Sequence, residues 1–161
     1  METVLTTPFS SVYKVFYSKI TDDFYMELTP SDTDAIVEEL LLNAIPHFEF
    51  PRVDIFDYSA ATDFEEGHFN VPLSNEEINI IATYMVYTWL SQQIASVENV
   101  RMKYSGSDFK FTSQANHIDK LIKLREHFKE EGFHLQRLYK RRRKDQNGRI
   151  VSTFSDWLLK E

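Results

Sequence analysis

Residues 74–97, SNEEINIIATYMVYTWLSQQIASV, are the most hydrophobic helical stretch of the chain and decide how the rest must pack. Ser74, followed by Glu76 and Glu77, predicts a helix start, because a short polar side chain caps free amides and acidic residues favour the positive end of the helix dipole. The apolar residues that follow cover two sides of the helix: Ile78, Ile81, Met85 and Trp89 on one, Ile80, Tyr84, Tyr87 and Ile94 on the other. A helix that is apolar on two faces is predicted to lie in the middle of a bundle.

Two shorter helices are predicted before this stretch. Thr7 and Pro8 are typical of an N-cap and a first helical position. Ser31 and Asp34 resemble a capping box at the start of a second helix, which Pro46 closes. Apolar residues recur after each start at three- and four-residue steps: Phe9, Val12, Tyr13, Phe16, Tyr17 and Ile20, then Ile36, Val37, Leu40, Leu41, Ala44 and Ile45.

A long helix is predicted over about residues 114–143, with Ser113 as its cap. Its apolar seam carries one charged residue, Arg125, among these positions: Ile118, Leu121, Phe128, Gly132, Leu135 and Tyr139. Thirty residues give a rod of roughly 45 Å, longer than a domain of this size needs for its own core, so part of it should project. Gly132 indicates either a kink or a close contact with another helix.

The segment 47–73 breaks the helical pattern. Short extended runs flank the acidic, small-residue stretch DYSAATDFEEGH (57–68), which predicts a β-hairpin or a long loop inserted into the bundle. Asn147 and Gly148 predict a turn before a C-terminal arm, residues 147–161. The predicted protein is therefore mainly α: a helical domain over 1–146 with an insertion at about 47–73, one long C-terminal helix, and the arm.

Charge is distributed very unevenly along the chain. Residues 1–100 contain 17 acidic and 3 basic residues, whereas residues 101–161 contain 15 basic and 8 acidic ones. The basic end is expected to meet an acidic surface, either on a neighbouring copy or another partner, or by folding back onto its own acidic half. The absence of cysteine excludes disulfides and thiolate metal sites. The sequence shows no signal peptide and no membrane-spanning run, so assembly inside a cell and no membrane partner are expected.

The sequence lacks four common catalytic and ligand-binding motifs. The phosphate-binding GxxxxGK, the dinucleotide-binding GxGxxG, the nucleophile GxSxG and the zinc-binding HExxH are all missing. The acidic residues of the insertion lack the spacing of a calcium-binding loop, and the histidines form no short ligand pair. We therefore expect no enzyme activity, no catalytic residues, no metal and no cofactor.

The candidate site lies at the C-terminal end and is expected to bind a partner protein or a neighbouring subunit. Four of its residues are cations in the run Lys140–Lys144, which exceeds what helix capping needs. The other four are apolar residues of the arm, which are expected to anchor in a groove of another subunit. The eight residues are Arg141, Arg142, Arg143, Lys144, Phe154, Trp157, Leu158 and Leu159. Two alternatives stay open: phosphate binding by the basic run, and folding of the arm back onto its own core.

Two runs of the sequence carry a resemblance to a known family: DDFYMELTPSDTDAIVEELLLNAIPHFEF, and EINIIATYMVYTWLSQQIASVENVRMKYSGSDFKFTSQANHIDKLIKLREHF. Over about residues 8–143 the chain resembles head-to-tail connector (adaptor) proteins of the tailed-bacteriophage neck, in helix order and helix lengths. The resemblance implies a homo-oligomeric ring of about twelve subunits below the portal, extending the channel through which DNA leaves. It also implies that the basic helix end and the arm dock on the portal.

The leading hypothesis is thus a virion structural protein of the phage neck that takes part in genome ejection. It would assemble in the host cytoplasm and reside in the virion, with further neck or tail proteins as neighbours and with DNA passing through without sequence-specific contacts. The first alternative is a nucleic-acid-binding module that uses residues 140–144 without base specificity. The second is an adjacent tail-completion or tail-terminator protein of the same virion.

Overall fold

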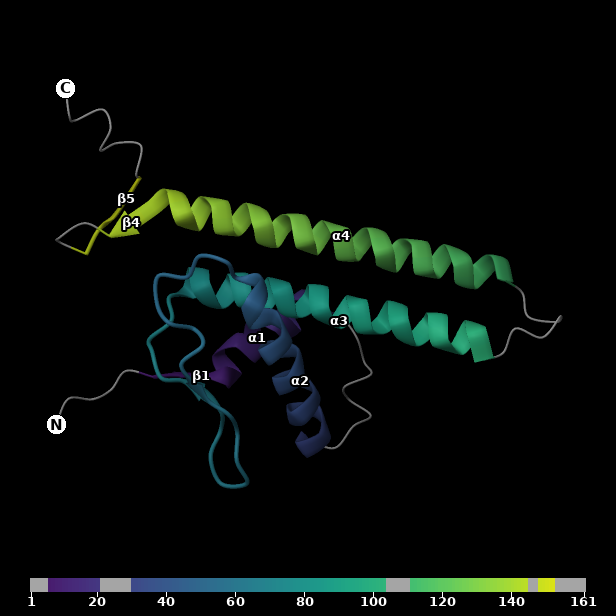
Figure 1. The fold of residues 1–161 in the computed structure, drawn as a ribbon, viewed down its shortest axis with the longest axis horizontal. Helices are drawn as coiled ribbons and strands as arrows, with labels where there is room; N and C mark the ends of the chain where they lie inside the picture. The colour runs from purple at the N-terminus through teal and green to yellow at the C-terminus, as the bar shows by residue number, and fades with distance from the viewer. Residues whose placement is uncertain (1–5, 21–29, 104–110, 145–147, 153–161) are drawn as a thin grey trace.

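The computed structural model describes residues 6–20, 30–103, 111–144 and 148–152, and this part of the chain is mainly α-helical (Figure 1). The helices are α1 (Phe9–Lys19), α2 (Pro30–Ala44), the 3-10 turn η2 (Ile45–His47), α3 (Asn75–Lys103) and α4 (Phe111–Arg141). The strands are short: β1 (Thr7–Pro8), β2 (Tyr58–Ser59), β3 (His68–Phe69), β4 (Arg142–Lys144) and β5 (Ile150–Ser152). The predicted helical bundle with a long C-terminal helix is confirmed.

Helix α3 is the centre of the bundle, as its sequence predicts. It contacts α4 along one side and α1 and α2 on the other. Figure 1 shows α4 and α3 side by side in opposite directions, with α1 and α2 below the N-terminal half of α3. Every residue from Ile80 to Val86 is buried, because neighbours cover this part of the helix on all sides. The far ends of α3 and α4 extend beyond α1 and α2, as expected from the length of the rod (Figure 1).

The core combines aromatic and branched side chains from all parts of the described chain. Burial of such large apolar groups is the main favourable term in folding. The largest fully buried side chains are Phe9, Phe16, Leu40, Leu41, Ile45, Phe48, Ile55, Phe69, Ile80, Ile81, Met85 and Tyr139. Phe48 and Ile55 show that the segment after η2 belongs to the core, although it has little regular structure.

The insertion contains a small antiparallel hairpin, which confirms one of its two predicted forms. Strands β2 and β3 pair with Tyr58 opposite Phe69, and β1 adds to the other edge of β3 with Thr7 opposite Phe69. The expectation that Thr7 caps α1 is wrong, since Pro8 is the N-cap residue. The Thr7 hydroxyl instead donates to the carbonyl of Val71 at 3.1 Å and accepts from the amide of Leu73 at 2.8 Å. It therefore ties β1 to the end of the insertion.

The predicted helix starts differ in accuracy. Ser74 is confirmed as a capping residue: its amide and its hydroxyl each donate to Glu77 Oε2 at 2.7 Å, and the Glu77 amide donates back to Ser74 Oγ at 3.4 Å. By contrast, α2 begins at Pro30 and α4 at Phe111, so Ser31 and Ser113 lie inside their helices. Proline is well suited to begin a helix because its ring fixes φ and its missing N–H is not needed there.

Gly132 allows α4 to pack closely against α3. A Cβ atom at this position would lie 2.7 Å from Cζ of Tyr84, so only glycine lets α4 approach the Tyr84 ring on α3. The sequence left two explanations for Gly132 open, a kink and a close contact with another helix. The geometry supports the close contact.

Substituting Gly132 by alanine is therefore expected to lower the free energy of unfolding by about 1–3 kcal/mol, although alanine is the better helix former. The Tyr84 ring cannot retreat freely, since it stacks on His47 with centroids 5.4 Å apart. Denaturant unfolding measures the loss. In a Tyr84→Ala background the same change should be neutral or stabilising, and an equal loss in both backgrounds would contradict the contact as the cause.

Candidate functional site

The predicted basic run does not lie on one continuous helix. Helix α4 ends at the exposed Arg141, and Arg142–Lys144 form strand β4, so the expected helix end at residue 143 is wrong. Strand β4 pairs antiparallel with β5, placing Arg142 opposite Ser152 and Lys144 opposite Ile150. Gly148 between them has φ of +75°, a backbone conformation that glycine adopts without strain. Strands β4 and β5 thus form a small antiparallel pair, to which residues 150–152 of the predicted arm belong. Asn147, the other residue of the predicted turn, lies outside the described residues.

The four apolar site residues, Phe154, Trp157, Leu158 and Leu159, lie outside the described residues. The structure describes the backbone of all four basic site residues. It describes the side-chain surroundings of two of them, Arg141 and Arg142. The structure therefore brings together the basic half of the candidate site, at the end of α4, and its apolar half stays a prediction.

A buried network anchors this basic end to the core. Tyr139 is 1% exposed, and its hydroxyl donates to Glu77 Oε1 at 2.5 Å while accepting from the amide of Arg52 at 2.9 Å. The Arg52 guanidinium lies over the Tyr139 ring, 3.8 Å from its centroid. Its Nη2 donates to the backbone carbonyls of Tyr139 and Arg142. Arg52 thereby satisfies acceptors that the end of a helix leaves unpaired, which is the physical reason why α4 can end there.

Cations at this end of α4 also have contacts within the chain. Arg142 Nη1 forms an ion pair with Glu76 Oε1 at 2.5 Å, at the start of α3. The ammonium of Lys140 lies 4.2 Å from the centroid of the Phe50 ring. The intramolecular interpretation of the charge asymmetry therefore holds for Arg142, whose partner belongs to the acidic half of the sequence.

Burial raises the pKa of the Tyr139 hydroxyl well above its usual range, and the hydrogen bond to Glu77 raises it further. A tyrosine whose folded pKa is raised contributes stability below its unfolded pKa of about 10, and this contribution is lost as the pH rises above that value. We expect a Tyr139→Phe variant to be less stable at neutral pH by about 1–3 kcal/mol, because the carboxylate of Glu77 and the amide of Arg52 each lose a partner. It should also lose less further stability than the wild type between about pH 9 and 11.

Thermal melts of both proteins across this pH range test the expectation. Tyr58→Phe is the matched control, since Tyr58 is 36% exposed, and its melting temperature at neutral pH should stay close to that of the wild type. Equal alkaline losses in Tyr139→Phe and the wild type would contradict the role given to this hydroxyl.

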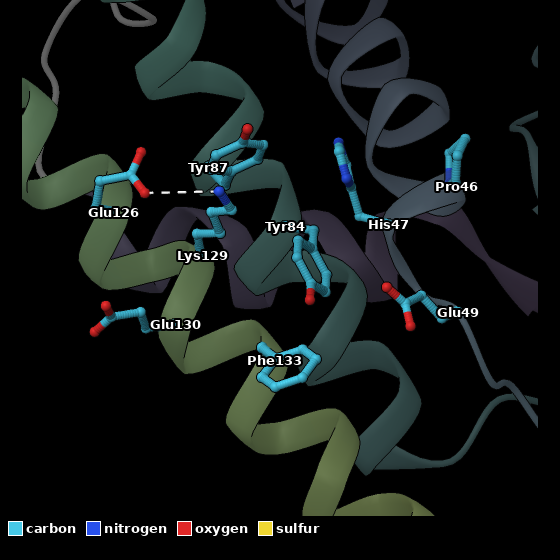
Figure 2. A pocket seen from close by; sticks show the side chains of 9 residues that line it. All are labelled: Pro46, His47, Glu49, Tyr84, Tyr87, Glu126, Lys129, Glu130 and Phe133. Carbon is cyan, nitrogen blue, oxygen red and sulfur yellow. Dashed lines mark ion pairs between the residues drawn. The ribbon is translucent and has the colours of Figure 1, made fainter.

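A second feature, which the sequence did not reveal, is an open pocket of about 430 Å³ between residues 46–49, α3 and α4 (Figure 2). Aromatic rings form much of its wall: His47 stacks on Tyr84 and meets Tyr87 edge-on, with ring centroids 5.2 Å apart. Phe133 closes the side formed by α4 and is 52% exposed. The only sequence signal was the pair Tyr84 and Tyr87 on the second apolar face of α3.

Charged groups of both signs surround this pocket. Glu49, Glu126 and Glu130 carry carboxylates, and Lys129 carries the ammonium. Burial lowers the pKa of His47, and the nearby charge of Lys129 lowers it further, so the ring is uncharged at neutral pH. Carboxylates therefore outnumber cations on the lining of this pocket.

Within the described residues, no group of three or more histidine or acidic side chains is placed to hold a metal ion. None of the described helices is long and apolar enough to cross a membrane. In comparisons with protein-family models, with curated proteins and with solved structures, nothing matches the chain.

Proposed function

We propose that this chain is a non-enzymatic structural protein of a tailed-phage neck, which forms a homo-oligomeric ring, joins the portal to the tail and extends the DNA channel. The observation that supports it best is the way the basic end of α4 is held. Arg52, Tyr139 and Glu77 fix this end to the core, so the backbone of α4 at Tyr139 and of β4 at Arg142 is held in place. A charged segment whose backbone is already held loses less conformational entropy on docking, which suits a permanent assembly contact.

The proposed partners are the portal and neighbouring copies of the chain. The basic end of α4 would meet acidic or mixed surfaces on these partners. The arm adds four apolar anchors, Phe154, Trp157, Leu158 and Leu159. DNA passes through the ring without sequence-specific contacts. The long α3–α4 pair supports a ring as well, because its projecting part offers two helices to adjacent subunits (Figure 1).

Mass photometry of the purified chain, alone and with a purified portal, tests the proposal. We expect multimers, or multimers gained on the portal, that weaken as salt rises to about 0.5 M, because exposed charge pairs are screened at that ionic strength. Multimers that are insensitive to salt would indicate an apolar contact instead of the charged one.

Electron microscopy of the particle, with an antibody against this chain, locates it. Label at the head–tail junction supports the neck proposal, and label at the distal side of the neck identifies a tail-completion protein. A chain that remains monomeric, is absent from the particle and binds DNA with a steep loss of affinity in salt would instead be the nucleic-acid-binding module.

A further inference from the structure

The pocket between residues 46–49, α3 and α4 is held in shape by one buried side chain, Gln136 of α4, which is 4% exposed. Its amide nitrogen donates to the backbone carbonyl of His47 at 2.9 Å and to the hydroxyl of Tyr84 at 2.5 Å. Its amide oxygen accepts from the backbone amide of Glu49 at 2.8 Å. All three walls are thereby joined by direct hydrogen bonds, so the pocket exists before any ligand arrives.

The charges in this pocket are not balanced internally. Lys129 pairs with Glu126 at 3.7 Å, and Glu126 also pairs with Arg125 at 2.9 Å. Within the described part of the chain, the carboxylate of Glu49 has no ion-pair partner. Figure 2 shows this carboxylate pointing toward Tyr84 and Phe133, whereas Glu130 points to the other side of α4.

A carboxylate beside aromatic faces is a favourable environment for a guanidinium group. Its flat cation can stack on a ring and donate two hydrogen bonds to one carboxylate. A phosphate or another anion would meet the carboxylate of Glu49 and is disfavoured. The pocket is also partly open to solvent, as a side chain entering from another molecule requires.

We propose that this pocket receives an arginine side chain from the basic run 140–144 of a second copy of the chain. The inference rests on the proposed function, since it takes the copies to be neighbours in a ring. Charge complementarity supports a second copy as the source of this arginine, because the same chain supplies both the acidic aromatic pocket and five consecutive cations.

Within the described residues, two cations of the run have contacts of their own chain outside the pocket. The ammonium of Lys140 lies over the Phe50 ring, and Arg142 forms an ion pair with Glu76. The proposed contact is intermolecular and joins two different surfaces, which generates a closed ring or an open filament.

The test uses the full chain, at a concentration where it is monomeric, and a fluorescent peptide of residues 138–146, LYKRRRKDQ. The expected result is saturable binding by fluorescence anisotropy, at least about tenfold tighter than that of a control peptide with all five cations changed to glutamine. Glu49→Gln and Phe133→Leu should each weaken binding by about tenfold. Glu49→Gln keeps the bonds to Gln136, since these involve the backbone of residue 49.

The matched controls are Glu65→Gln and Phe64→Leu, exposed residues of the insertion outside the pocket, which should leave binding unchanged. Circular-dichroism melts establish that each variant is folded. Equal binding of the two peptides, or equal weakening by the pocket variants and their controls, overturns the proposal.

If the peptide fails to bind but the chain is found in the neck, this contact is wrong and the proposed function stands. If the peptide binds but the chain is absent from the particle, the pocket stands and the proposed function fails.

Discussion

Replacing Phe9 by alanine is expected to lower the free energy of unfolding by about 3–5 kcal/mol, as large-to-small changes of buried aromatic residues do. Phe9 is fully buried at the start of α1, and its ring meets that of Phe69 edge-on with centroids 5.0 Å apart. The backbone amide of Phe9 also donates to the carbonyl of Gly67 at 2.9 Å. The substitution thus leaves a cavity where α1, the sheet and the insertion meet.

Chemical denaturation of the purified variant measures this loss. Phe64→Ala is the control, because Phe64 is 95% exposed and its removal should change stability by less than about 0.5 kcal/mol. A loss below about 1 kcal/mol for Phe9→Ala would mean that α1 contributes little to the fold.

The second large effect concerns assembly. A triple variant with Arg141, Arg143 and Lys144 changed to glutamate should weaken ring formation or portal binding by at least about 100-fold, because like charges then face the acidic partner. Arg142 is left unchanged, since its ion pair with Glu76 belongs to the fold. The measurement is mass photometry with the portal, together with the amount of the chain in purified particles.

A matched triple variant separates position from net charge. Lys14→Glu, Lys120→Glu and Lys123→Glu change the same total charge on exposed parts of α1 and α4. This control should assemble normally. Equal loss in both variants would show that overall charge governs assembly, and a lower melting temperature of the first variant alone would assign its defect to folding.

The sequence by itself determined the parts of this protein that depend on local pattern. The apolar residues on two faces of 74–97 placed α3 in the centre of the bundle, because each face must be covered by another helix. The capping pair Ser74 and Glu77 fixed its start, since donors and acceptors three residues apart meet within one turn. The spacing of apolar residues also predicts the length of α4, and the change in composition predicts the interruption of the helical pattern at residues 47–73.

Tertiary structure decided what depends on residues far apart in the chain. Helix α4 ends at Arg141 because Arg52, distant in sequence, takes up its terminal carbonyls, and no local signal announces this. Thr7 fits the pattern of an N-cap but bonds to the end of the insertion instead, since the sheet offers it partners there. The pocket exists only because Gln136 joins His47, Glu49 and Tyr84, three residues that precede it by 52 to 89 positions. Sequence periodicity reports which face of an element is buried, whereas the partner of a buried polar group is set by packing.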